Sequence, residues 1–226
     1  MKPTSSREQE AREDRLESRI AALERRLSSL EDAEAIKRLQ RCYGYYLTHG
    51  LIDDLLDLFA DRPDTSLLIA KGEYKGKQGV TRFLRSLNNP PNRLFFHQVM
   101  MISGIVDVAP GRDHARGRWF GFGACALPDY DGGTQGWMNG VYENEYVRED
   151  EVWKINRIRW CSFFFPPDLP LDVALLDHAF ASIPDIFPDP HFEADGPPEV
   201  TVYASGFVCP THFVNPVSGR GDSTPA

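Results

Sequence analysis

The feature that most constrains this fold is a run of four long, strand-like segments that occupies the middle of the chain. The segments are predicted at 94–108, 114–127, 136–148 and 152–165, with turn-forming residues between them. Successive strands joined by short turns pair antiparallel, so the four segments predict a β-meander. Glycines recur inside the strands, at positions 117, 121, 123 and 140. Because glycine inside a strand favours bulges and sharp bends, we expect a strongly curved sheet.

The residues before this meander are predicted to be mainly helical. Apolar residues follow an a/d heptad spacing in the first 30 residues, at Leu16, Ile20, Leu23, Leu27 and Leu30. The charged segment 1–30 therefore predicts a helix that needs a partner, either another subunit or its own domain. Ser29-Leu30-Glu31-Asp32 fits a capping box, which predicts that a second helix begins near residue 31. Shorter helices are expected at 51–59 and 79–87, with a buried strand at 65–70 between them.

The order of these elements indicates an α+β domain in which a cone-shaped, curved antiparallel sheet wraps around N-terminal helices. A length of 226 residues suits one such domain with extensions. We predict boundaries of 1–30 for the charged helix, 31–165 for the cone domain, 166–217 for a C-terminal extension and 218–226 for a disordered tail. The extension is rich in phenylalanine, so we expect it to cover the cone or a subunit interface.

Composition argues against several functional classes. Lys and Arg number 25 against 33 Asp and Glu, and the net charge of −8 argues against nucleic-acid binding and against binding to an anionic membrane surface. No apolar run suits a membrane span or a signal peptide, so a cytoplasmic location is expected. The four cysteines are far apart and form no C-x-x-C pair, which predicts reduced, mostly buried thiols and neither a disulfide framework nor a zinc site.

Several motifs in the predicted cone domain carry a family resemblance. They are Ala35-Ile36-x-x-Leu39-x-x-x-Tyr43, the stretch Leu51 to Asp61, Gly76-x-x-Gly79-Val80, His97 at the start of a strand, and Gly140 to Val147 followed by Trp153-Lys154-Ile155. Over residues 32–165 the chain resembles the SnoaL-like members of the nuclear-transport-factor-2-like superfamily. That superfamily includes polyketide cyclases, scytalone dehydratase, ketosteroid isomerase, aromatic lyases, dioxygenase small subunits and non-catalytic binders. The resemblance implies a cone fold, acid–base chemistry by side chains inside the cone, and no metal or organic cofactor.

The resemblance also assigns individual positions. His97 matches the strand histidine of the family, and an imidazole in an apolar cone can take and return a proton. The dehydratase and cyclase branches commonly carry an aspartate on the first core helix, where this chain has Thr48. The second strand histidine of the dehydratase falls near Ala124 and is absent. A melanin-type dehydratase is therefore not expected.

The candidate catalytic residues are His97, which would move the proton, and two phenols. Tyr43 on the core helix and Tyr142 on the third meander strand are predicted to orient substrate oxygens, because a phenol can hydrogen-bond to an oxyanion. Substrate-binding residues are predicted at Tyr46, Arg41, Met101, Arg118, Phe120, Asn144 and Trp137.

Either face of the third meander strand could line the cavity. Tyr142 and Asn144 share one face and Trp137 lies on the other, because successive side chains of a strand alternate. The family analogy implies that the even-numbered face looks inward. A bulge at Gly140 would reverse the register and bring Asn139 or Glu145 inward instead.

Together these residues predict a cofactor-independent lyase of the dehydratase or formaldehyde-lyase type. It would act by acid–base catalysis on a small phenolic, lignin-derived or polyketide substrate and eliminate water or formaldehyde. We expect a homo-oligomer, a dimer or a trimer, with no nucleic-acid partner, no membrane partner and no metal. Three alternatives stay open: a non-catalytic binding or assembly module, which Thr48 favours; a polyketide cyclase or isomerase; and a small subunit of an aromatic dioxygenase.

Overall fold

The computed structural model describes residues 4–69, 72–87, 95–127, 134–165 and 195–196. Its helices are α1 (Thr4–His49), α2 (Ile52–Asp57) and α3 (Gly76–Ser86). Its strands are β1 (Ser66–Ile69), β2 (Gly72–Lys75), β3 (Phe96–Val108), β4 (His114–Leu127), β5 (Thr134–Glu149) and β6 (Val152–Phe165). The expected extension at 166–217, apart from residues 195–196, and the expected tail at 218–226 lie outside the described residues.

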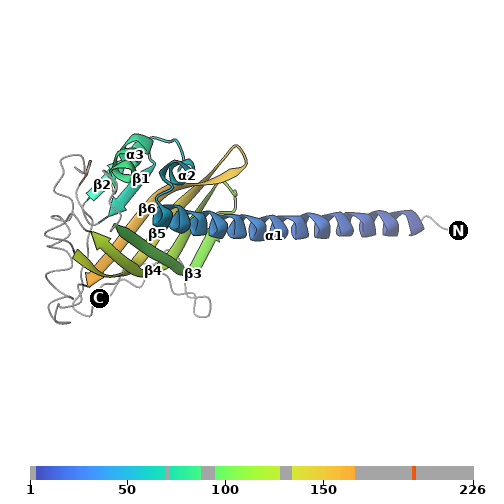
Figure 1. The fold of residues 1–226 in the computed structure, drawn as a ribbon. Helices are drawn as coiled ribbons and strands as arrows, with labels where there is room; N and C mark the ends of the chain where they lie inside the picture. Colours follow the sequence, from blue (N-terminus) through green and yellow to red (C-terminus); the bar gives the residue numbers. More distant parts are fainter. Residues whose placement is uncertain (1–3, 70–71, 88–94, 128–133, 166–194, 197–226) are drawn as a thin grey trace, which may run out of the picture.

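The strands form one curved sheet in the order β2-β1-β6-β5-β4-β3 (Figure 1). The β3 to β6 meander is antiparallel throughout, as the sequence predicts. The short strand β1 pairs antiparallel with β2 but parallel with β6, so the complete sheet is mixed. The C-terminal half of α1 packs against this sheet, and the predicted α+β cone fold is confirmed.

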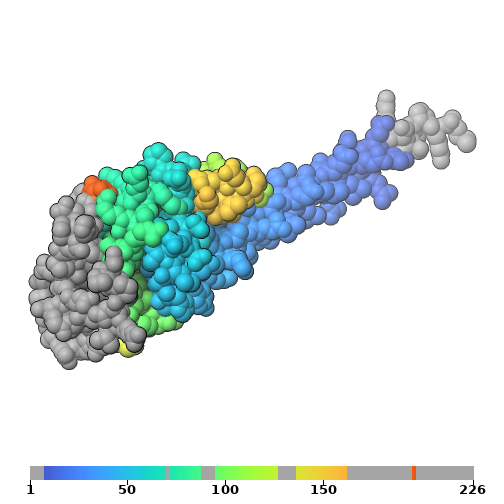
Figure 2. Space-filling model, turned by 45° about the horizontal axis from the view of Figure 1, so that its top comes forward, coloured from blue at the N-terminus to red at the C-terminus, as the bar shows by residue number. Residues whose placement is uncertain are grey.

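The helix α1 is one continuous helix of 46 residues, so the prediction of a new helix near residue 31 is wrong. The apolar stripe changes phase after Leu30 because it moves to another face of the same helix. At 100° per residue, the stripe at 16–30 is centred about 170° from the stripe at 36–47. The second stripe packs on the sheet, whereas the first projects away from the domain as an isolated rod (Figure 2).

The strand glycines do not act as predicted. The register of the meander shifts only between Ile102 and Ile105 and between Glu145 and Tyr146, whereas the glycines at 117, 121, 123 and 140 stay in regular pairing. At three strand positions a glycine instead makes room for an aromatic ring, because an added Cβ would lie 2.0 Å from Trp119 at Gly104, 2.8 Å from Tyr146 at Gly117 and 2.5 Å from Trp160 at Gly121. These glycines allow large rings to lie flat on the sheet.

A buried carboxylate ties α1 to the far end of the meander. Asp32 is 4% exposed, and its Oδ2 accepts a 2.5 Å hydrogen bond from Arg112 Nε in the β3–β4 turn. Its Oδ1 accepts a 2.9 Å bond from Trp153 Nε1 and lies 3.6 Å from Arg148. Burial alone would favour the neutral acid, but the bonds from Arg112 and Trp153 outweigh it and lower the pKa of Asp32.

The described residues contain no helix apolar and long enough to cross a bilayer. Cys42, Cys125 and Cys161 are free thiols, the last two buried, as the sequence predicts. Cys209 lies outside the described residues.

Candidate functional site

The inner face of the sheet, which packs against α1, is the candidate site. The helix runs along this face from the end that holds the Asp32 cluster toward the opposite end. Tyr43 therefore lies over the middle of the sheet, and Gly44 packs closely on β3, where an added Cβ would be 3.1 Å from Met101 Sδ and 3.6 Å from the carbonyl oxygen of Val99. The last turn of α1 is consequently level with the start of β3.

A cluster of aromatic rings fills the middle of the inner face. The Tyr142 ring stacks on Trp160 with a centroid distance of 4.0 Å. Tyr43 meets Tyr142 edge-on at 6.3 Å and Phe59 at 6.2 Å. Burial raises the pKa of both Tyr43 and Tyr142, so both phenols stay protonated at physiological pH and can each donate a hydrogen bond. The prediction that Tyr142 faces inward is confirmed, and Gly140 causes no register reversal.

A buried polar network lies next to these rings. Asn144 is 1% exposed and donates from Nδ2 to Gln40 Oε1 at 3.1 Å, while its Oδ1 accepts from the backbone N–H of Arg159 at 3.3 Å. Tyr146 donates its hydroxyl to Gln40 Oε1 at 2.7 Å and accepts from Trp119 Nε1 at 3.0 Å. Asn144 thus points inward as expected, but its hydrogen bonds go to other parts of the protein itself.

Sequence reasoning missed Gln40 and Tyr146. The available signal was Gln40, a polar residue on the helix stripe between Ile36 and Tyr43. A wholly buried glutamine calls for hydrogen-bond partners; the facing strand supplies two donors to Gln40 Oε1, whereas Nε2 is buried without a partner among the described residues.

His97 lies at the start of β3 on the inner face, opposite Cys125 of β4. Its side chain is half-buried, and Nδ1 is enclosed without a hydrogen-bond partner in the described part of the chain. Burial lowers the pKa of His97 to about 4, so the imidazole is neutral at physiological pH. The neighbouring thiol of Cys125 has its pKa raised to about 12 by the same burial.

The three predicted catalytic residues occupy different levels of the inner face. The strand partner of His97 on β4 is Cys125, and that of Tyr142 is Trp119. Six residues of β4 separate these partners, which is about 20 Å along an extended strand. Tyr43 lies between the two levels and touches Tyr142. His97 therefore lies near one end of the site, and the phenols lie deeper.

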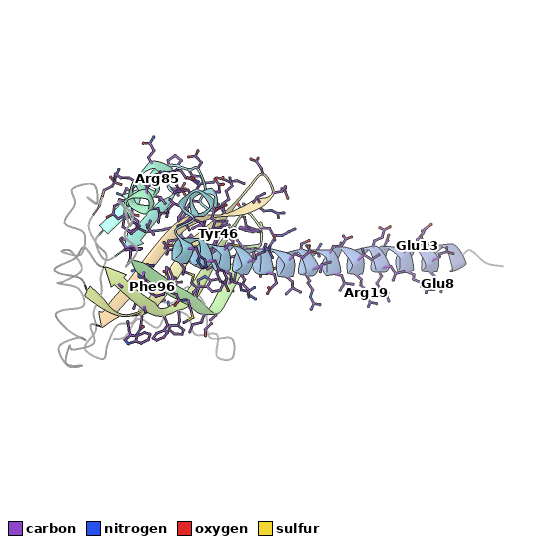
Figure 3. The ribbon with its side chains drawn as sticks, viewed as in Figure 1. Glu8, Glu13, Arg19, Tyr46, Arg85 and Phe96 are labelled. Carbon is purple, nitrogen blue, oxygen red and sulfur yellow. The ribbon has the colours of Figure 1, made fainter. Side chains whose placement is uncertain are left out.

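Of the site residues predicted on α1 and β3, some lie against the inner face of the sheet and one is exposed to solvent. Met101 is half-buried on the inner face beside α1. Tyr46 is half-buried on the last turns of α1, and electrostatic repulsion from Cys42 is the main cause that raises its pKa. Figure 3 labels Tyr46 on the part of α1 that lies against the sheet. Arg41 is exposed, and Thr48 is half-buried about one turn after Gly44, which packs on Val99 and Met101 of β3.

Three predicted substrate-binding residues lie on the opposite, outer face of the sheet, which corrects their expected position in the cavity. Arg118 forms a 2.8 Å ion pair with Glu143 there. Phe120 is 54% exposed and Trp137 is 55% exposed, and Trp137 stacks on Phe122 at 5.6 Å. The physical reason is strand alternation. Because Tyr142 and Asn144 point inward, the odd-numbered residues of β5, including Trp137, point outward, and Arg118 and Phe120 of β4 pair with two of these outward residues, Glu143 and Val141.

No three His, Cys, Asp or Glu side chains among the described residues gather as a metal site. The site as described consists of one neutral imidazole, protonated phenols and an apolar, aromatic wall.

Comparison with solved structures supports the fold. A hexachlorocyclohexane dehydrochlorinase of Novosphingobium barchaimii superposes with a TM-score of 0.53 at 21% identity, covering 64% of this chain and 98% of that one. A candidate scytalone dehydratase of Novosphingobium aromaticivorans gives 0.51 at 19% identity, covering 62% and 91%. A protein of unknown function from Mycobacterium tuberculosis gives 0.50 at 15% identity, covering 70% and 86%. At these identities the likeness shows the fold alone.

Sequence comparison identifies the family. No curated protein matches the chain by sequence. The SnoaL-like domain family matches residues 28–159, which is more than half of the chain and includes the helix, the strands and the histidine that form the inner face. The curved sheet around α1 and this sequence match agree, and the chain belongs to the SnoaL-like domain family of the nuclear-transport-factor-2-like superfamily.

Proposed function

We propose that this chain is a cofactor-independent lyase or isomerase that acts on a small aromatic or polyketide-like molecule, with His97 as the group that accepts the proton. The observation that carries the proposal is the His97 imidazole, half-buried on the inner face, neutral, and with an enclosed Nδ1 that has no partner among the described residues. A neutral imidazole with one ring nitrogen that is not engaged by the protein can take a proton from a bound molecule.

The phenols of Tyr43 and Tyr142 are suited to stabilising the negative charge that forms when the proton is removed. Tyr43 and Tyr142 keep their protons because burial raises the pKa of each. A protonated phenol in an apolar site can donate a hydrogen bond to an oxygen that gains negative charge when His97 removes a proton. Because the Tyr142 level lies about 20 Å from the His97 level along an extended strand, we assign oxygen binding near His97 to Tyr43 and ring packing to Tyr142.

The named reactions of the structural neighbours fit the same class. A dehydrochlorinase and a candidate dehydratase both remove a small molecule from carbon, and such an elimination begins with or includes a proton transfer. For this chain we propose elimination of water or formaldehyde from a phenolic substrate, because the inner wall is aromatic and presents hydroxyl donors.

Product formation by matched variants tests the proposal. The full chain, His97→Gln and His114→Gln are incubated with a panel of lignin-derived phenols, phenolic polyketides and chlorinated cyclohexanes, and products are followed by absorbance and mass spectrometry. His114 is the control because it is an exposed histidine in the same sheet, at the start of β4. We expect His97→Gln to lower kcat by about 10²–10⁴-fold and His114→Gln to leave it unchanged. Turnover by His97→Gln at the wild-type rate would refute the role of His97.

A second candidate function is ligand binding without turnover, which Thr48 favours because it replaces the acidic residue that the family resemblance leads us to expect on this turn. This function predicts that phenols raise the melting temperature of the wild-type chain while no compound of the panel is converted.

A further inference from the structure

The first part of α1 presents an apolar stripe on which no other described element of the chain packs. Its members are Leu16, Ile20, Leu23, Leu27 and Leu30, with exposed fractions of 47%, 54%, 58%, 57% and 67%. Figure 2 shows this part of the helix standing clear of the domain. Five large aliphatic side chains in a row on a solvated helix are unusual unless another surface covers them.

The spacing of the stripe is that of a two- to three-stranded coiled coil. Steps of 4, 3, 4 and 3 residues place Ile20 and Leu27 at a positions, and Leu16, Leu23 and Leu30 at d positions. At the preceding a position stands Glu13, which ends the apolar seam on its N-terminal side. The seam lies on the face of α1 opposite the stripe that packs on the sheet, so a partner on the seam would not compete with the domain.

The charges beside the seam indicate what covers it. The g positions are Arg12, Arg19 and Arg26, and the e positions are Glu17, Glu24 and Glu31. None of these six side chains lies within ion-pair distance of an oppositely charged described residue, although the charge of Glu31 contributes to the raised pKa of Arg112; the close ion pairs of α1 involve Asp32, Glu34 and Lys37. Figure 3 shows Arg19, labelled, on the projecting part of the helix.

These charges select one orientation of a second copy. In a parallel, in-register pair each g residue faces the e residue five positions later in the other chain. Arg12 then faces Glu17 of the other copy, Arg19 faces Glu24, and Arg26 faces Glu31. In an antiparallel pair g faces g and e faces e, so every contact would be Arg–Arg or Glu–Glu, which is repulsive.

We propose that residues 12–31 of α1 form a parallel, in-register coiled coil with the same residues of further copies of this chain. The apolar seam supplies the contact, and the alternating Arg and Glu flanks set the orientation. The C-terminal half of the same helix packs on the sheet of its own domain. The coiled coil would therefore join the copies at one end of each domain, and each domain would keep its own candidate site.

Charge exchange on the full-length chain tests both the surface and the orientation. The basic variant is Glu17→Arg with Glu24→Arg, and the acidic variant is Arg12→Glu with Arg19→Glu. When either variant self-associates in the parallel register, its changed positions place arginine opposite arginine or glutamate opposite glutamate. We therefore expect the dissociation constant for self-association to rise about tenfold or more. Mixing the two variants restores attraction at all four contacts, as does combining the four changes in one chain. Sedimentation equilibrium measures each case.

The matched control is Glu8→Arg with Asp14→Arg, which reverses two acidic charges on the same helix at c and b positions, away from the seam. We expect the control to associate like the wild type. Leu23→Asp with Leu27→Asp should abolish association, and circular dichroism will show whether the domain stays folded. A Glu13→Cys variant should form an intermolecular disulfide, because the parallel register places the two residues 13 side by side.

Several outcomes would overturn the proposal. They are a wild-type chain that stays monomeric at 100 μM, association that persists in the Leu23→Asp, Leu27→Asp variant while its domain is folded, or charge variants that associate as strongly alone as when mixed. Persistent association would place the contact on another surface, such as the apolar outer face of the sheet.

Discussion

The buried Asp32 cluster allows a direct test of how α1 is held to the meander. The exposed pair Asp53–Arg85 is a natural comparison, because its 2.6 Å contact is nearly as short as the 2.5 Å contact of Asp32 with Arg112. The Asp53 side chain is 84% exposed, however, and the Asp32 side chain is 6% exposed. If burial rather than distance decides the free energy, the two aspartates must respond very differently to the same substitution.

The structure sets the magnitudes. Removing one member of a buried ion pair typically costs 3–5 kcal/mol, and a tryptophan N–H without its acceptor costs a further 1–3 kcal/mol, as order-of-magnitude values. Arg112 and Arg148 are 33% and 21% exposed and can regain some water, which places Asp32→Ala at the lower end of this sum, at about 4 kcal/mol. Asp32→Asn keeps an acceptor for Trp153 and should cost about 2 kcal/mol. Asp53→Asn should cost below about 1 kcal/mol.

Urea unfolding followed by tryptophan fluorescence measures these free energies, with circular dichroism as the second probe for a two-state transition. A pH series adds an independent check. Because the pKa of Asp32 is lowered below 3.8 in the folded chain, its contribution is present above that value and is lost as the pH falls below it. The difference between wild type and Asp32→Asn should therefore shrink in acid. Equal costs for Asp32→Asn and Asp53→Asn would show that burial does not decide the energy of this pair.

Three further predictions concern the inner face. The pKa of His97 falls from 6.5 to about 4 on folding, so the unfolded chain takes up the proton first, and stability should decline as the pH drops from 6.5 toward 4; His97→Gln should lack this decline in pH-dependent urea unfolding. Gly121→Ala should lower the free energy of unfolding by about 1–3 kcal/mol, because the new Cβ would lie 2.5 Å from the Trp160 ring; an unchanged urea midpoint would contradict this packing. Cys125, with a pKa of about 12, should react with a disulfide reagent at least about tenfold faster in urea than when folded, and rapid labelling of the native chain at this residue would disprove its burial.

The sequence predicted the strands well because local signals set their limits. The predicted limits of β4 and β6 agree with the structure to the residue, since turn sequences and polar hairpin residues bound both strands. The sequence analysis was wrong about the helix break near residue 31, because a change in hydrophobic phase can mean either a new helix or a new face of the same one. Only the contacts of Asp32 and Ile36 with the sheet distinguish these two possibilities.

The candidate site was harder to predict because it depends on contacts between distant segments. Alternation along β5 indicated that Tyr142 and Asn144 share a face, but no local signal shows that Gln40 lies opposite Asn144. Arg118, Phe120 and Trp137 were placed in the cavity although they share the outer face, because composition alone does not tell which side of a curved sheet packs against the helix. An exposed aromatic outer face resembles a buried one in sequence.

The low pKa of His97 and the threonine at position 48 together limit the chemistry that this site can perform. A carboxylate beside an imidazole would favour the charged ring and raise its pKa, whereas the half-buried Thr48 carries no charge to do so. With a pKa of about 4, His97 is a weak base, so it can remove only a proton whose departure the site assists, for example by a phenol hydrogen bond to the oxygen that gains negative charge. The proposed reaction should therefore have a kcat/KM that rises through about pH 4 and stays level to above pH 7. A rise centred near pH 6.5 would instead show that the imidazole is solvated and that a dry inner face does not control its basicity.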